Sequence, residues 1–117
     1  MQKFSFKSVK NILNQNIKDF GEMIKIISGP ELKINLLIND WDHLSAEITE
    51  KEFSGKLINT TVFFDNDTCA LKILFEGHGK RIFKMYAETG ITNDVVEEMK
   101  KDIHQYITKG IIPVGAK

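Results

Sequence analysis

The chain has 117 residues, of which 42% are hydrophobic and 27% charged, and its formal net charge at pH 7 is zero. These values fit one globular domain over residues 1–117, which is large enough for a single core but too small to divide, and they are ordinary for a soluble globular protein. The apolar runs are too short for a membrane-spanning helix, and the neutral charge argues against a protein that coats nucleic acid indiscriminately. The charge is unevenly distributed, with +3 over residues 1–39, −5 over 40–67 and +2 over 68–117. Any anion-binding face is therefore expected to be local.

The N-terminal residues and the single cysteine indicate the compartment. Residues 1–7 lack the apolar core and small-residue cleavage site of a secretory signal. Cys69 has no second cysteine to pair with, and its apolar strand-like surroundings favour a buried thiol in a reducing environment. We therefore expect a cytoplasmic protein with no membrane association.

A helical pattern follows a short strand predicted at residues 4–6, with Ser8 as its N-cap. Its apolar stripe consists of Val9, Ile12, Leu13, Ile17 and Phe20. Two endings are compatible with the sequence. Gly21 is predicted to end the helix, followed by a strand over residues 22–28, and the alternative is a helix that continues to Gly29 and Pro30.

Between residues 31 and 88, apolar and polar residues alternate almost without a break, which predicts a series of half-buried strands. The predicted strands cover residues 31–38, 43–49, 53–64, 68–76 and 80–87. Their short polar connections join antiparallel neighbours, and Gly55 suggests a bulge. The predicted fold class is α+β: a strongly curved antiparallel meander that approaches a barrel, flanked by an N-terminal and a C-terminal helix.

A second helix is predicted from Thr92 or Asn93 to Gly110. Its apolar stripe consists of Val95, Val96, Met99, Ile103, Tyr106 and Ile107. Acidic residues lie near its start and lysines near its end, which suits the helix dipole. The apolar tail at residues 111–114 is expected to lie against the sheet.

The segment from Gly77 to Arg81 is the most suggestive local feature, because it combines two glycines, a histidine and the chain's single arginine, with Lys84 nearby. Glycines let a backbone approach a ligand closely, and arginine can bind a phosphate through two hydrogen bonds. The simpler alternative is a tight hairpin with solvated charges. The spacing does not match a phosphate-binding P-loop.

No pattern in the sequence indicates catalysis or metal binding. Asp40 and Asp42 are interpreted as caps of a turn and His43 as the first residue of a strand, since the glycine-spaced calcium-loop pattern is absent. Cys69 and the histidines are scattered over separate predicted elements. We therefore expect a non-enzyme with no cofactor and no metal.

Strand aromatics can stack on unpaired bases when they face solvent. Phe64 and Phe75 share their parity with apolar neighbours and are predicted to be buried. Phe63 and Tyr86 are the predicted outer-face aromatics.

From its opening Phe-Ser-Phe-Lys-Ser-Val-Lys to its closing Ile-Ile-Pro-Val-Gly-Ala-Lys, the chain resembles the small PrgU-type proteins of enterococcal pheromone-responsive conjugative plasmids. The length, the order of elements and the Lys-, Ile- and Asn-rich composition carry this resemblance, and the composition fits a low-GC Gram-positive source. The resemblance implies a fold similar to the PUA RNA-binding pseudobarrel. It also implies a role in restraining expression of conjugation and surface-adhesin genes through messenger RNA. It supplies no family binding residues.

We therefore expect a non-catalytic regulator that binds RNA, with its oligomeric state open. The lysines Lys7, Lys10 and Lys18 of the first helix are predicted to join Lys80, Arg81 and Lys84 in contacting phosphates. The predicted base contacts are His78 and Tyr86. The alternative is a cystatin-like or lipocalin-like binding module for a small apolar ligand or a partner protein.

Overall fold

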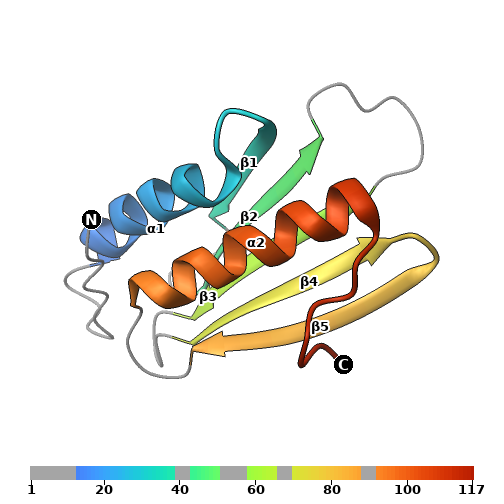
Figure 1. The fold of residues 1–117 in the computed structure, drawn as a ribbon. Coiled ribbons are helices and arrows are strands. Elements are labelled where there is room, and N and C mark those ends of the chain that lie inside the picture. Colours follow the sequence, from blue (N-terminus) through green and yellow to red (C-terminus); the bar gives the residue numbers. More distant parts are fainter. Residues whose placement is uncertain (1–12, 39–42, 51–57, 66–69, 88–91) are drawn as a thin grey trace.

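A computed structural model describes residues 13–38, 43–50, 58–65, 70–87 and 92–117. The elements are α1 (Leu13–Ser28), β1 (Leu32–Ile38), β2 (His43–Glu50), β3 (Asn59–Asp65), β4 (Leu71–Gly77), β5 (Lys80–Ala87) and α2 (Asn93–Lys109). The strands form one antiparallel sheet in chain order, and both helices lie on the same face of it (Figure 1). The predicted α+β meander is confirmed.

The sheet is open. Among the described strands, β1 and β5 form its two edges, so the sheet is not closed into a barrel. In the described part of the chain, neither helix is long and apolar enough to cross a membrane.

Helix α1 continues past Gly21 to Ser28, so the prediction of a helix end at Gly21 and a strand over residues 22–28 is wrong. The reason is packing. Met23, Ile24 and Ile27 continue the three- and four-residue stripe of Phe20, and all four are buried in the core. Burial of this stripe outweighs the cost of about 1 kcal/mol of one glycine inside a helix.

The predicted strand positions agree with the structure apart from their ends. β3 begins at Asn59, and Ile58 before it is not in a strand. The predicted start of this strand at residue 53 and the bulge at Gly55 lie outside the described residues, as do the strand at 4–6 and the cap Ser8. The fourth strand begins at Leu71, after Ala70.

Strand register separates the two faces of the sheet. Ala46, Val62 and Ile73 are paired across β2, β3 and β4, and all three are fully buried under the helices. Phe64 and Phe75 share this face and are fully buried, as predicted. The opposite face, here called the open face, carries Lys33, Asn35, Glu47, Thr49, Asn59, Thr61, Phe63, Asp65, Lys72, Leu74, Glu76, Arg81, Phe83 and Met85.

Helix α2 has the ends that the sequence predicted. The Thr92 hydroxyl accepts a hydrogen bond from the Val95 N–H at 3.3 Å, and Gly110 closes the helix in the left-handed region with φ 68°. The C-terminal turn of α2 is joined to the β4–β5 turn. The Tyr106 hydroxyl donates to the Gly77 carbonyl at 2.7 Å, and His78 Nε2 donates to the Tyr106 carbonyl at 2.9 Å. These bonds hold the hairpin turn against the helix.

The two glycines that the sequence used as helix ends are expected to respond oppositely to alanine. Gly110→Ala should lower the free energy of unfolding by about 1–2 kcal/mol, because a Cβ is strained at positive φ and would lie 3.3 Å from the His78 ring. Gly21→Ala should raise it by about 0.5–1 kcal/mol, because its Cβ would meet open space within a helix. Urea unfolding of both variants tests this, and the same sign for the two would contradict it.

The segment after α2 runs along the edge of the sheet. Lys117 exchanges two backbone hydrogen bonds with Phe83 of β5, at 2.8 and 2.9 Å. The end of the tail therefore reaches the sheet, but of the apolar tail residues only Pro113 is buried. Ile111, Ile112 and Val114 are all exposed, and Val114 retains 89% of its accessible surface.

Candidate nucleic-acid interface

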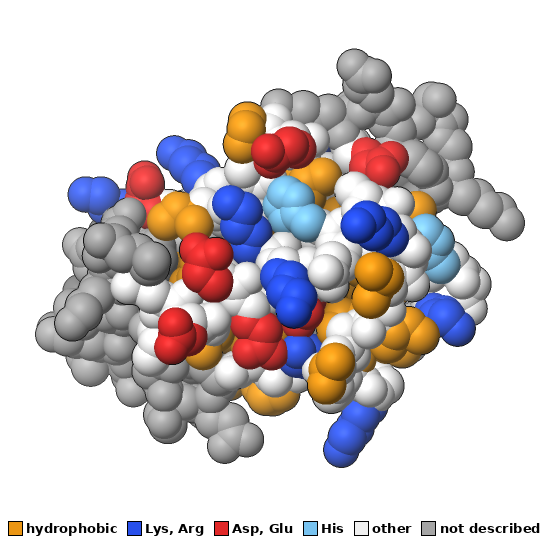
Figure 2. Space-filling model, viewed as in Figure 1, with side chains coloured by type: hydrophobic (Ala, Val, Ile, Leu, Met, Phe, Trp, Pro, Cys, Tyr) orange, Lys and Arg blue, Asp and Glu red, His pale blue; other side chains and the backbone are white. Residues whose placement is uncertain are grey.

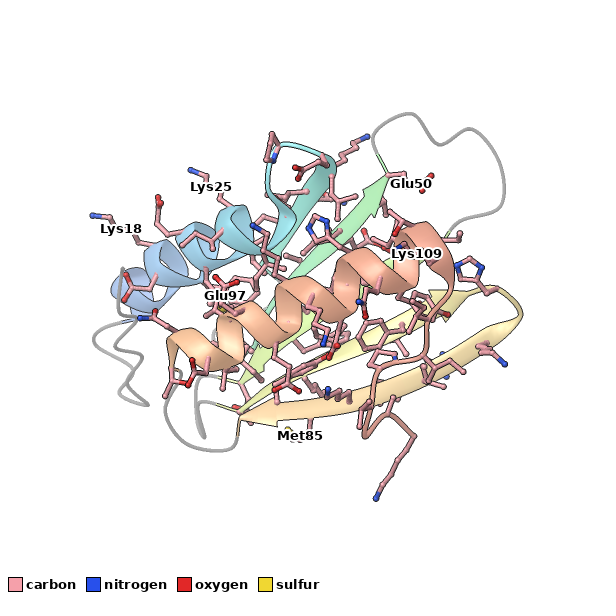
Figure 3. The ribbon with its side chains drawn as sticks, viewed as in Figure 1. Lys18, Lys25, Glu50, Met85, Glu97 and Lys109 are labelled. Atoms are coloured by element: carbon pink, nitrogen blue, oxygen red, sulfur yellow. The ribbon has the colours of Figure 1, made fainter. Side chains whose placement is uncertain are left out.

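The residues predicted to contact RNA do not form one surface. Lys18 is exposed on α1, whereas Lys80 and Arg81 are exposed beside the β4–β5 turn. Figure 3 places Lys18 at one end of the molecule, and Figure 1 places the β4–β5 turn at the other. Lys7 and Lys10 lie outside the described residues.

The helix-covered face offers no concentration of positive charge over its described residues. Lysine and acidic side chains are interspersed there (Figure 2). On α1, Lys25 pairs with Glu22 at 3.7 Å, one turn earlier. Such a face is typical of a solvated surface rather than of a phosphate-binding one.

The side chains of Lys84 and Tyr86, both on β5, lie between this strand and α2. The Lys84 side chain is 9% exposed, and its Nζ lies 2.7 Å from Asp102 Oδ2 and 2.6 Å from Glu98 Oε2. The Tyr86 hydroxyl donates to the same Asp102 oxygen at 2.8 Å. The prediction that Tyr86 faces outward is wrong. Tyr86 and Lys84 are two residues apart on β5, so both side chains lie on the face that the helices cover. Both side chains therefore contribute to the attachment of α2.

Lys84, Tyr86, Glu98 and Asp102 form a polar cluster, in which the pKa of Lys84 and that of Tyr86 are both raised. Burial disfavours the charged ammonium, but hydrogen bonds to Asp102 and Glu98 and their negative charges outweigh this and raise the pKa of Lys84 above 10.5. Burial, with the hydrogen bond to Asp102, raises the pKa of Tyr86 well above its ordinary 10.0. The cluster therefore favours a charged lysine and a neutral phenol.

These shifts predict a loss of stability in alkali. A group whose pKa is raised on folding contributes stability below its unfolded pKa and loses that contribution as the pH rises. The contribution of Lys84 and Tyr86 to the free energy of unfolding should therefore be constant near pH 7 and decrease above about pH 10. Urea unfolding between pH 7 and 11 should show a shallower alkaline decline for the Lys84→Met, Tyr86→Phe double variant. Parallel declines would contradict the prediction.

The open face carries a cluster of aromatic and cationic side chains on β3, β4 and β5, here called the Phe63–Lys72–Phe83 cluster. Lys72 Nζ lies 5.6 Å from the Phe63 ring centroid and 5.7 Å from that of Phe83. Arg81 lies 5.8 Å from the Phe83 ring and pairs with Glu76 at 3.6 Å. Phe63 is partly exposed, and Phe83 retains 40% of its accessible surface. One exposed ring, one partly exposed ring and two cations thus share one area.

Two hollows adjoin this cluster, with volumes of about 370 and 540 Å³. Lys72 and Met85 line both, Phe63 lines the first and Phe83 the second. Met85 is 53% exposed, and Figure 3 shows it projecting from β5 away from the helices. The cluster therefore has space around its rings for a flat ligand.

The charges on the open face are balanced in the described strands. Its cations are Lys33, Lys72 and Arg81, and its carboxylates are Glu47, Asp65 and Glu76. Lys117 adds a cation beside the second hollow. Binding here must depend on ring contacts and shape more than on net charge.

The sequence identified Phe63 and Arg81 but missed Lys72, Phe83 and Met85. In β5, apolar residues occupy both parities, so alternation alone could not assign the faces. The structure assigns the faces through Lys84. This lysine is buried and paired with Asp102 of α2, so Phe83 and Met85 on either side of it lie on the opposite face.

Within the described residues, the His, Cys, Asp and Glu side chains form no group of three that could hold a metal ion. Asp40, Asp42 and Cys69 lie outside these residues. His104 Nε2 donates to the Ile27 carbonyl at 2.9 Å and so links the two helices.

A scan against protein-family models and searches of curated proteins and solved structures found no match. The chemistry of the open face is therefore the main guide to function.

Proposed function

We propose that this chain is a non-catalytic protein that binds single-stranded RNA on the open face of its sheet. The observation that supports this most is the Phe63–Lys72–Phe83 cluster, in which an ammonium group lies within 6 Å of the partly exposed Phe63 ring and of the exposed Phe83 ring. The helices cover the other face of the sheet, so the cluster is accessible from solvent.

Unpaired bases fit such a surface for a physical reason. Every base has a flat π face that can stack on a phenyl ring, and this stacking tolerates different sequences. Lys72 and Arg81 would contact the phosphates that connect stacked bases. A duplex hides its base faces, so this surface should discriminate against paired RNA.

The resemblance to the PrgU-type plasmid proteins supports RNA as the nucleic acid and a regulatory role. On this proposal, the protein acts in the cytoplasm of a Gram-positive host. It binds messenger RNA of a mobile element and restrains the expression of conjugation and surface-adhesin genes. The finer proposal of a PUA-like pseudobarrel rests on the same resemblance.

Fluorescence anisotropy with a labelled 12-nucleotide RNA of mixed sequence tests the proposal. The single strand should bind at least ten times more tightly than the same RNA in a duplex. Because few cations border the cluster, the slope of log K against log salt should not exceed about 3 in magnitude. Absence of binding, equal affinity for the duplex, or tighter binding of the matching DNA would contradict it.

A partner protein is the second candidate, favoured by the exposed Ile111, Ile112 and Val114 of the tail. The double variant Ile111→Ser, Ile112→Ser would distinguish RNA binding from binding of a partner protein. It should leave RNA affinity unchanged, because neither residue lines the hollows beside the Phe63–Lys72–Phe83 cluster.

A further inference from the structure

A polar groove lies on the open face over β1, β2 and β3. Its volume is about 430 Å³, and it is lined by Lys33, Ile34, Asn35, Glu47, Thr49 and Asn59. The Glu47 carboxylate lies between two amides. Asn35 Nδ2 donates to one of its oxygens at 3.1 Å, and Asn59 Nδ2 donates to the other at 2.9 Å.

These bonds fix the orientation of both amides. A carboxylate only accepts hydrogen bonds, so each asparagine must present its NH₂ group to Glu47 and direct its carbonyl oxygen elsewhere. Asn59 Oδ1 is buried and has no hydrogen-bond partner among the described residues. A buried acceptor without a donor is costly, so an incoming N–H group at this position would be stabilised.

The groove is therefore rich in acceptors. Each oxygen of the Glu47 carboxylate retains a second lone pair that can accept a hydrogen bond from a ligand. Its complement is a flat group with adjacent N–H donors. Among the RNA bases, guanine alone has two neighbouring donor groups on its pairing edge, the ring N1–H and the N2 amino group.

The groove and the Phe63–Lys72–Phe83 cluster lie on the same face. Glu47 pairs with Thr61, Thr61 with Leu74, and Leu74 with Phe83, so Glu47 and Phe83 occupy one cross-strand row. Three strand spacings separate them, or roughly 14 Å. Thr61 lies between them on β3, and Phe63 lies in the adjacent row, paired with Ser45 and Lys72. An RNA strand stacked on the rings can therefore extend a neighbouring base into the groove.

We infer that this groove is a guanine-binding subsite of the RNA interface, an inference that rests on the proposed function. The Phe63–Lys72–Phe83 cluster supplies affinity for any single strand. The groove adds sequence preference, with the Glu47 carboxylate accepting hydrogen bonds from the two adjacent donors of guanine.

The test uses labelled ten-nucleotide uridine RNAs that carry guanosine, inosine or adenosine at one central position. Inosine lacks only the N2 amino group of guanosine. Wild-type protein should bind the guanosine RNA at least ten times more tightly than either of the others. Glu47→Gln should reduce this preference to less than threefold while binding of plain uridine RNA is retained.

Glu50→Gln is the matched control, because Glu50 is on the same strand but, three residues further on, has the opposite parity. It should keep the guanosine preference. Equal affinity for guanosine and inosine RNA, with binding still dependent on Phe83, would overturn the subsite and leave the proposed function intact. Failure of every RNA to bind would overturn both.

Discussion

Lys84→Met is expected to lower the free energy of unfolding by about 3–5 kcal/mol, because removing one member of a buried ion pair leaves a buried charge uncompensated. Methionine keeps the alkyl volume of lysine and removes the ammonium that Asp102 and Glu98 share. Asp102 is 7% exposed and would retain the hydrogen bond from the Tyr86 hydroxyl. Urea unfolding at pH 7 measures the change.

The double variant Lys84→Met, Asp102→Leu is the control. Replacing a buried pair by apolar groups is often close to neutral, so it should recover most of the lost stability. Glu98→Gln should cost less than about 1 kcal/mol, since that side chain is 52% exposed. A loss below about 1 kcal/mol for Lys84→Met alone would mean that the cluster does not hold α2 to β5.

Phe83→Ala is expected to weaken binding of single-stranded RNA about 5- to 150-fold, because one base stacked on an aromatic ring contributes about 1–3 kcal/mol. Phe63→Ala should have an effect in the same range. The double variant should bind too weakly to be measured at micromolar protein. Anisotropy with the 12-nucleotide RNA gives these affinities.

Two substitutions away from the Phe63–Lys72–Phe83 cluster are the controls. Val114→Ala removes a side chain that is 89% exposed on the tail, and Lys25→Ala removes an exposed lysine of α1. Both should bind RNA with wild-type affinity. If Lys25→Ala weakens binding as much as Phe83→Ala does, the interface lies on the helices and the proposed one is wrong.

Local chemistry explains which elements the sequence predicted. The cap residue Thr92 and the closing residue Gly110 form hydrogen bonds only to residues within five positions in the sequence, so local sequence was enough to predict both ends of α2. The meander was readable for the same reason, because short polar turns leave antiparallel pairing as the only connection. Gly21 was misleading because the burial of Met23, Ile24 and Ile27 depends on the rest of the fold.

The composition of the open face could not be predicted from the sequence, because it depends on contacts between distant segments. Lys84 looked like a surface charge of the hairpin, but its partners lie on α2, 14 and 18 residues later. Arg81 and Lys84 are three residues apart on one strand and therefore lie on opposite faces of the sheet. The Phe63–Lys72–Phe83 cluster likewise requires the register of three strands, which no local pattern specifies.

The two faces of β5 thus have different roles. Lys84 and Tyr86 attach the sheet to α2 through Asp102. Phe83, which directly precedes Lys84, projects from the opposite face beside Lys72. Substitutions on the first face should change stability, and those on the second should change RNA affinity with little effect on folding.

Ultraviolet crosslinking of the purified protein to single-stranded RNA, followed by mass spectrometry of the attached peptides, tests the central claim most directly. Crosslinks are predicted at Phe63 and Phe83, in peptides that cover β3 and β5. Crosslinks confined to α1 or α2, or none under conditions in which a control RNA-binding protein reacts, would contradict it.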